Sequence, residues 1–254
     1  MDKSKIAYSS EKVVKYYDRN DMLQKAESTI LALLKKKLTS MQMLDIGVGG
    51  GRTTKHFAPL VKEYTGVDYS EAMINLCKSK FKEFHFFAAD ARNLSIFPAN
   101  SFDFILFSFN GIDYMGHDDR IRCLSEIKRL LKKDGYFCFS SHNILSIQQW
   151  KSIKFSINPQ ALFQNTVLYF KRKKVNRMNS STLREITRND FAIVNDGAHD
   201  WQLRTYYVNP KSEIIRLENI GFRDIRLFDL KDGNELSKQE IEHAVDKWLY
   251  YLCK

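Results

Sequence analysis

The stretch Met43-Leu44-Asp45-Ile46-Gly47-Val48-Gly49-Gly50-Gly51-Arg52 decides the fold of this chain. A short apolar run ends at an acidic residue, and four glycines follow within five positions. The residues at 53–60 are compatible with a helix, and the order strand, tight turn, helix brings a backbone loop close to a bound nucleotide. Glycine suits such a loop because a Cβ atom would hinder both positive φ angles and close approach of a ligand. The alternative is a glycine-rich surface turn, and the rest of the chain decides between the two.

Strands and helices alternate as far as residue 143. Apolar segments predict strands at 63–67, 84–88, 102–109 and from 136 onward, and helical spacing of apolar residues predicts helices at 71–80 and 118–132. Asp134-Gly135 is expected to stop the second of these helices. This alternation is typical of a parallel sheet with helices on both faces.

The alternation ends after residue 143, which divides the chain into four parts. We predict an N-terminal helical arm at 1–38, with a helix capped by Asn20 or Asp21, and a ligand-binding core at 39–143. Residues 144–204 are polar and irregular and predict an inserted substrate or lid region with strands at 166–173 and 192–194. Residues 205–254 complete the core with a helix from Pro210 to Gly221 and strands at 222–230 and 248–253.

Composition excludes several classes of protein. A hydrophobic content of 44% excludes a disordered chain, and four separated cysteines without a C-x-x-C pair argue against a zinc or disulfide framework. No window reaches the ~18 apolar residues of a membrane span, and no apolar leader follows Met1, so we expect a cytoplasmic protein. The 40 Lys and Arg against 30 Asp and Glu give a net charge of +10, which favours anionic partners.

Polar residues stand where the predicted strands end. Ligands of open α/β sheets bind at the carboxyl ends of strands, and here those ends carry Asp45 with Gly47, Asp68, Asp90, Asn110, and His142 with Asn143. Asp68 follows a glycine loop at about the distance where such folds place the acid that accepts hydrogen bonds from ribose hydroxyls. A helix cap is the structural alternative for Asp68.

The glycine spacing argues against two common nucleotide loops. A dinucleotide site requires G-x-G-x-x-G, but the sixth position is Arg52 counted from Gly47 and Thr54 counted from Gly49. A Walker lysine followed by serine or threonine is also missing, which excludes a triphosphate cradle.

These motifs resemble those of the class I S-adenosylmethionine-dependent methyltransferases. The resemblance runs in order through the first to fourth motifs and the turn before the fifth strand, at 45–52, 66–73, 89–91, 102–111 and 130–136. It covers about residues 40–143, and residues 206–253 resemble the closing helix and hairpin of the fold. It implies a Rossmann-like, mostly parallel seven-stranded sheet with helices on both faces and an inserted lid region after the fifth strand. It also implies S-adenosylmethionine as cofactor.

The resemblance also implies roles for individual residues. Asp45, Gly47 and Gly49 would contact the methionine part of the cofactor, and Asp68 would hold the ribose hydroxyls. Tyr69 would pack on the adenine, Asp90 and the Ala91 backbone would bind its edge, and Asn110 would lie near the transferred methyl group.

The catalytic and substrate residues are less defined. The reaction would be an in-line displacement by a substrate oxygen or nitrogen, in which alignment supplies much of the rate. His142 is the candidate general base, and a histidine bonded into a turn with Asn143 is the alternative. The candidates for closing over the substrate or contacting it are Tyr16, Tyr17, His199 and Tyr206. We expect no metal, because Asp118 and Asp119, near Asp113, are typical helix-start residues.

The acceptor stays open between two classes. We expect a methyltransferase acting on a hydroxyl or amine of a small polar metabolite, of sugar or natural-product type, recognised by the insert. The alternatives are an RNA methyltransferase that uses the basic cluster at 171–174, or an S-adenosylmethionine-binding protein without catalysis. Against nucleic acid, Phe109-Asn110-Gly111-Ile112 stands where amino-methylating enzymes carry an Asn/Asp-Pro-Pro-aromatic tetrad.

Overall fold

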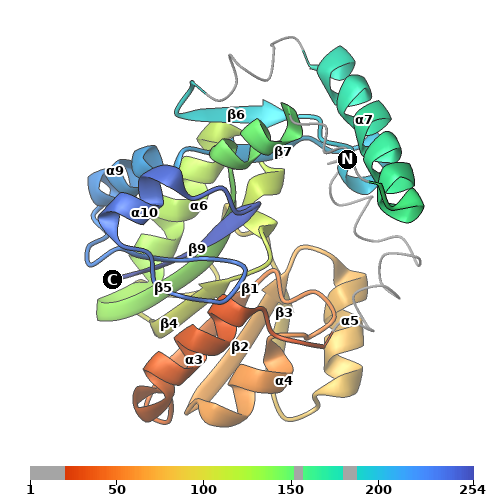
Figure 1. Cartoon of the computed structure of the whole chain (residues 1–254). Coiled ribbons are helices and arrows are strands. Elements are labelled where there is room, and N and C mark those ends of the chain that lie inside the picture. Colours follow the sequence, from red (N-terminus) through yellow and green to blue (C-terminus); the bar gives the residue numbers. More distant parts are fainter. Residues whose placement is uncertain (1–20, 152–156, 180–187) are drawn as a thin grey trace.

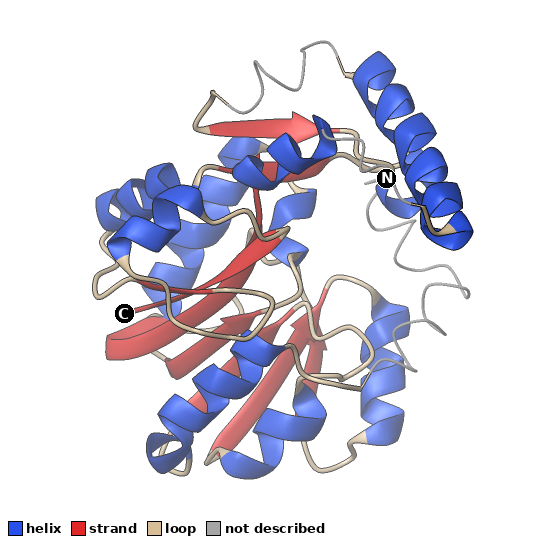
Figure 2. Cartoon of the chain, in the orientation of Figure 1, coloured by secondary structure: helices blue, strands red, loops and turns tan. Residues whose placement is uncertain are grey.

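A single sheet forms the centre of the molecule (Figures 1 and 2). The computed structural model describes residues 21–151, 157–179 and 188–254. Within these ranges nine strands contribute to the sheet: β1 (Gln42–Ile46), β2 (Glu63–Asp68), β3 (His85–Ala88), β4 (Phe102–Phe107), β5 (Leu131–Asn143), β6 (Phe191–Val194), β7 (Thr205–Val208), β8 (Arg226–Phe228) and β9 (Trp248–Cys253).

The main sheet has the topology predicted by the resemblance. Its strands lie in the order β3-β2-β1-β4-β5-β9-β8, with the first five parallel and β9 antiparallel to both of its neighbours. β6 and β7 add to these seven strands: β7 pairs in parallel with the last two residues of β5, and β6 pairs antiparallel with β7. The predicted fold class, a mostly parallel Rossmann-like sheet with helices on both faces, is confirmed.

Helices cover both faces because the central strands are apolar on both faces. On one face α3 (Lys25–Leu38), α4 (Thr54–Phe57) and α5 (Glu71–Lys80) pack over the alternate residues Met43, Phe104 and Leu106. On the other face α6 (His117–Leu130), α9 (Pro210–Ile220) and α10 (Lys238–His243) pack over Leu44, Ile105 and Phe107. Four short 3₁₀ helices complete the described elements: η1 (Ala58–Leu60), η2 (Gly111–Tyr114), η3 (Ile144–Lys151) and η4 (Ala198–Trp201).

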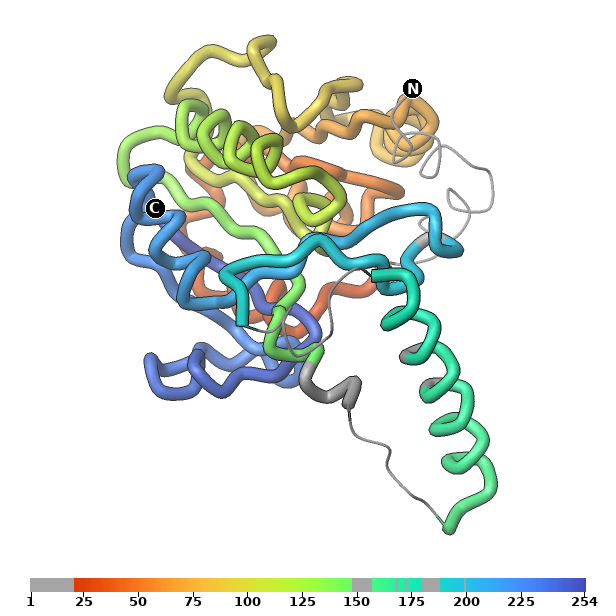
Figure 3. The backbone as a smooth tube through the Cα atoms, turned by 90° about the horizontal axis from the view of Figure 1, so that it is seen from above, coloured from red at the N-terminus to blue at the C-terminus, as the bar shows by residue number. Residues whose placement is uncertain are grey.

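The region after β5 is helical where a strand was predicted. Residues 166–173 lie within α7 (Pro159–Met178), which extends away from the body of the molecule (Figure 3). The helix begins with a cap, since the Gln160 N–H donates to Asn158 Oδ1 at 2.9 Å and Pro159 takes the first helical position. The aromatic and β-branched residues predicted a strand, but this start signal prevails, so that prediction was wrong.

Three predicted boundaries also differ. α3 begins at Lys25 and not after Asn20 or Asp21, because the Gln24 N–H donates to Glu27 Oε2 at 2.6 Å and closes the first turn. α6 ends at Leu130, and Asp134-Gly135 lies inside β5, where Asp134 adopts a left-handed φ of 64°. The strand predicted at 222–230 is limited to β8. Residues that are typical of helix caps and turns therefore did not mark where these helices and this strand begin or end.

Among the helices of the described residues, none has the length and apolar content that crossing a bilayer requires.

Candidate functional site

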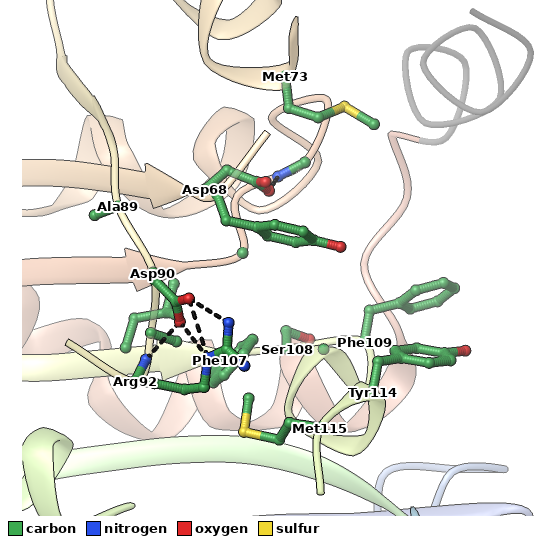
Figure 4. A pocket seen from close by; sticks show the side chains of 16 residues that line it. Asp68, Met73, Ala89, Asp90, Arg92, Phe107, Ser108, Phe109, Tyr114 and Met115 are labelled. Atoms are coloured by element: carbon green, nitrogen blue, oxygen red, sulfur yellow. Dashed lines mark hydrogen bonds and ion pairs between the residues drawn. The ribbon is translucent and has the colours of Figure 1, made fainter. Parts of the chain in front are cut away.

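A pocket opens where β1, β2 and β4 end, at the carboxyl edge of the sheet (Figure 4). Because parallel strands end together at this edge, residues from distant parts of the chain converge there. The pocket brings together six of the eight predicted cofactor-binding residues: Gly47, Gly49, Asp68, Tyr69, Asp90 and Ala91. The other two, Asp45 and Asn110, lie directly next to its lining.

The floor of the pocket is the glycine loop after β1. Gly47, Gly49 and Gly51 have φ angles of 66°, 55° and 85°, which a residue with a side chain rarely adopts. A Cβ atom on Gly51 would also lie 2.3 Å from the ring of Phe81. Both the backbone conformation and the packing therefore require glycine in this loop. Without side chains, the loop leaves its backbone accessible to a ligand.

Asp68 joins this loop to the second strand. Its Oδ2 accepts the Gly49 N–H at 3.0 Å and its Oδ1 accepts the Ser70 N–H at 2.8 Å. The side chain is almost fully buried, and desolvation raises the pKa of this carboxyl. Each carboxylate oxygen has a second lone pair, so Asp68 can hold the loop and still accept from two hydroxyl groups in the pocket.

Asp45 lies beneath the loop and does not line the pocket. Its Oδ2 accepts from the Thr53 hydroxyl at 2.6 Å and from the Tyr64 hydroxyl at 2.7 Å. Burial raises the pKa of Asp45 to about 6, because these two hydroxyl groups compensate only part of the lost hydration. In this structure Asp45 supports the loop from behind, and its contact with a cofactor stays a prediction.

Asp90 has a partner that the sequence did not reveal. Both of its carboxylate oxygens accept from the Arg92 guanidinium, with Nε–Oδ1 at 2.9 Å and Nη2–Oδ2 at 2.6 Å (Figure 4). Arg92 also donates to Asp119 at 3.0 Å. Arg92 lines the pocket, so a ligand donor that reaches Asp90 would share the carboxylate with this guanidinium. The position of Arg92 two residues after Asp90 was the only feature of the sequence that could have indicated this pair.

The chain after β4 holds a strained turn beside the pocket. Phe109 and Asn110 have φ angles of 55° and 61°, an unusual conformation for residues other than glycine. The Asn110 N–H donates to the Ser140 hydroxyl at 2.8 Å, while its buried Oδ1 forms no hydrogen bond within the described ranges. A buried acceptor without a partner is costly, so this oxygen suits a donor supplied by a ligand.

Several aromatic and apolar residues of the pocket were not predicted to bind a ligand. They lie between the last residue of β4 and the residue after η2, and include Phe107, Phe109, Tyr114 and Met115 (Figure 4). Their apolar character resembles that of core residues, so no sequence pattern distinguished them. Phe109 lies 5.0 Å below the Arg52 guanidinium, which fixes the ring at the edge of the pocket.

His142 belongs to a buried polar network next to η2. Both its backbone N–H and its Nδ1 lie 2.7 Å from Asp113 Oδ2. The other oxygen of Asp113 accepts from Arg120 Nη1 and from the Ser141 hydroxyl, each at 2.7 Å. The imidazole is thus held by Asp113 and not by a turn with Asn143, whose side chain bonds to the Ala244 carbonyl and the Leu145 N–H.

The predicted substrate residues are only partly placed. Tyr206 is fully buried in β7, with its hydroxyl 2.9 Å from His117 Nδ1, and it does not line the pocket. His199 lies in η4, while Tyr16 and Tyr17 fall outside the described residues. Of these four residues the structure therefore excludes only Tyr206 from the lining of the pocket, and the roles of the other three stay predictions.

Two of the acidic residues in and after η2 form ion pairs with arginine side chains. Asp113 pairs with Arg120, and Asp119 pairs with Arg92 and Arg122. Across the described residues, no group of three or more His, Cys, Asp or Glu side chains is arranged to hold a metal ion.

The fold, with its pocket at the carboxyl edge of the sheet, is that of the class I S-adenosylmethionine-dependent methyltransferases. Residues 43–135 match the family described as a methyltransferase domain. The chain is 33% identical over 106 residues to the uncharacterized methyltransferase YcgJ of Bacillus subtilis (strain 168), an alignment that covers 40% of each protein. The chain therefore matches about two fifths of the length of this curated relative. The class that the sequence motifs resemble is confirmed.

Two solved structures share the fold over nearly the whole chain. An S-adenosylmethionine-dependent methyltransferase from Clostridium acetobutylicum superimposes with a TM-score of 0.63 at 17% identity, covering 96% of this chain and 97% of its own. The 1,6-didemethyltoxoflavin-N1-methyltransferase of Burkholderia thailandensis, with bound 1,6-didemethyltoxoflavin and S-adenosylhomocysteine, gives 0.59 at 16% identity, covering 99% and 85%. At these identities the similarity establishes the fold, including the region outside 43–135.

Proposed function

We propose that this protein transfers a methyl group from S-adenosylmethionine to a hydroxyl or amine of a small polar metabolite. The observation that carries the proposal is the pocket in which the glycine loop, Asp68 and Asp90 meet at successive strand ends. The cofactor supplies a sulfonium-activated methyl group when bound. The chain contributes binding, orientation and exclusion of water.

The residues present suit that cofactor chemically. The lone pairs of Asp68 match a pair of ribose hydroxyls, and the bare loop at Gly47 and Gly49 admits a ligand against backbone. The unsatisfied Oδ1 of Asn110 matches an ammonium or amide donor. Tyr69 and Phe109 provide ring surfaces in the same pocket. Asn110 and Asp45 keep their proposed roles at the methionine end.

We also propose that His142 removes the proton of the acceptor group and that Asp113 positions it. With Nδ1–H donating to Asp113 Oδ2, the lone pair of the imidazole lies on Nε2, which makes no hydrogen bond within the described ranges. The side chain is 13% exposed, so it is accessible from solvent. Arg120 fixes the second oxygen of Asp113, which limits rotation of the carboxylate. A positioned base of this kind contributes about 10²–10⁴-fold to the rate.

The small-molecule class is supported by the Burkholderia protein, which has 1,6-didemethyltoxoflavin and S-adenosylhomocysteine bound and whose superposition covers 99% of this chain. The competing proposal, an RNA acceptor, draws on the net charge of +10 and on the exposed lysines of α7. RNA binding of that kind would weaken steeply with salt.

Two measurements test the proposal. S-adenosylhomocysteine should bind in calorimetry and raise the melting temperature, whereas NADH should do neither; the reverse result would contradict the cofactor assignment. Transfer of a labelled methyl group into a small-metabolite fraction, and not into an RNA fraction, should then identify the acceptor class. Incorporation into RNA alone would refute the small-molecule proposal.

The role of His142 is tested by substitution. His142→Ala should lower kcat by about 10²–10⁴-fold with the affinity for S-adenosylhomocysteine unchanged. Asp113→Asn should lower kcat less and alter the pH profile of kcat, which a purely structural change would not do. The matched control is His243→Ala, at an exposed site on α10, which should retain full turnover. Full turnover by His142→Ala would remove it as the base.

A further inference from the structure

Helix α7 exposes a dense group of large apolar side chains. Phe163 and Phe170 are 71% and 62% exposed, and Leu162 and Val167 beside them are exposed as well. Of the fourteen exposed large apolar side chains in the described ranges, seven lie between residues 157 and 178. Contiguous exposed apolar surface of this kind marks an interaction site in soluble proteins.

The C-terminal half of α7 is attached to the body of the protein. Val175 is buried against Ile144 and Val194, and Asn179 exchanges hydrogen bonds with the backbone of Asn195 at 3.1 and 2.9 Å. The N-terminal half projects outward, as Figure 3 shows. The apolar group is therefore held in position by a fixed stem and remains uncovered by the described parts of the fold.

The charges on α7 are all of one sign. Its twenty residues include no Asp or Glu, and Lys171, Lys173, Lys174 and Arg177 are exposed in its last two turns. The spacing of residues 163, 167, 170 and 174 places them on one helical face. Along that face the apolar side chains come first, Lys174 and Arg177 follow, and Lys173 lies at its border.

We propose that α7 docks the protein onto an anionic phospholipid surface. Phe163, Val167 and Phe170 would enter the interface between headgroups and acyl chains, while Lys173 and Arg177 contact lipid phosphates. Binding to a lipid surface strengthens with the apolar area that is buried and with the attraction of cations to anionic lipids, and α7 offers both. RNA is favoured less, because aliphatic side chains such as Val167 and Leu162 contribute little to phosphate or base binding.

The test is flotation of the full chain with vesicles of equal parts phosphatidylglycerol and phosphatidylcholine, compared with phosphatidylcholine alone. Wild type should float with the anionic vesicles only and be released by high salt. Phe163→Ser combined with Phe170→Ser should lower the partition coefficient by roughly tenfold or more, since two exposed rings would no longer be buried. Lys173→Gln with Arg177→Gln should lower it by about 30-fold, at about fivefold for each cation.

Matched controls are Ile215→Ser, an exposed apolar position on α9, and Lys62→Gln, an exposed cation before β2. Both should float like wild type. Circular dichroism and S-adenosylhomocysteine binding show whether each variant is folded. Equal flotation with neutral vesicles, absence of flotation, or a dimer in light scattering that Phe163→Ser dissociates would each overturn the proposal. Salt-sensitive RNA binding lost in the Lys173 variant, without flotation, would overturn it in favour of nucleic acid.

Discussion

Asp68→Asn tests the proposed cofactor site with a change of one atom. In the folded protein Oδ1 accepts the Ser70 N–H and Oδ2 accepts the Gly49 N–H. Asparagine keeps one acceptor oxygen and replaces the other with a donor. The substitution should therefore remove one hydrogen bond between the carboxylate and a ribose hydroxyl and loosen the loop at Gly49.

The size of the effect follows from the kind of hydrogen bond lost. A hydrogen bond to a charged group contributes about 1.5–3 kcal/mol, so the Kd for S-adenosylhomocysteine should rise by about 10–150-fold. The free energy of unfolding should change little, because the raised pKa shows that burial of the Asp68 charge is itself unfavourable. The stability gained by removing the buried charge offsets the cost of leaving the Gly49 N–H without an acceptor.

Isothermal titration calorimetry measures the effect, and urea unfolding measures stability. Asp224→Asn is the matched control, because this exposed carboxylate pairs with Lys254 far from the pocket, and its Kd should equal that of wild type. Acidification should weaken binding by wild type but not by Asp68→Asn, since protonation of the carboxyl removes the acceptor. A Kd for Asp68→Asn within about twofold of wild type would refute the assigned role, because even the weakest estimate exceeds that change.

Two further substitutions test the electrostatics beneath the pocket. Asp45→Asn keeps an oxygen for its hydroxyl partners, and should raise the free energy of unfolding by up to about 3 kcal/mol near pH 7, because the native pKa of about 6 exceeds the ordinary 3.8. Because the native pKa of Asp45 is raised, wild type loses stability as pH rises from about 4 to about 6. The stability that Asp45→Asn gains over wild type in urea unfolding should therefore vanish near pH 4. An equal gain at about pH 4 and about pH 7 would contradict the raised pKa. Glu27→Gln leaves the buried Arg52 without its charged partner and should cost about 3 kcal/mol in thermal and urea denaturation, whereas Glu235→Gln in an exposed pair should cost less than about 1. Equal losses of stability in the two variants would show that the buried Glu27–Arg52 pair contributes no more to stability than an exposed pair.

The local signals in the chain were sufficient for the core. The glycine loop at 47–51 and the acids at 68 and 90 predicted where strands end, and parallel strands bring such ends to one edge. Six of the eight predicted residues consequently line a single pocket. Chain order and residue type carry this information because strand, turn and helix are specified by short-range conformational preferences.

Other features depended on contacts between distant segments. The Arg92 guanidinium reaches Asp119 as well as Asp90, which requires the loop after β3 to lie beside the start of α6. Residues 166–173 have the composition of a strand but form part of α7, because the helix begins at the local cap of Asn158 and Pro159 and its final turns are fixed by the packing of Val175. Neither relation can be derived from local periodicity.

By itself, the sequence determined the class of fold, the position of the loop and the acidic residues at the carboxyl ends of β2 and β3. Only the tertiary structure decided that Asp113, between Arg120 and His142, holds the imidazole, that Asp45 supports the loop from below, and that α7 stands exposed. The physical reason is that hydrogen bonds and burial depend on which segments pack together in three dimensions. Periodicity, spacing and propensity report only the preferences of neighbours along the chain.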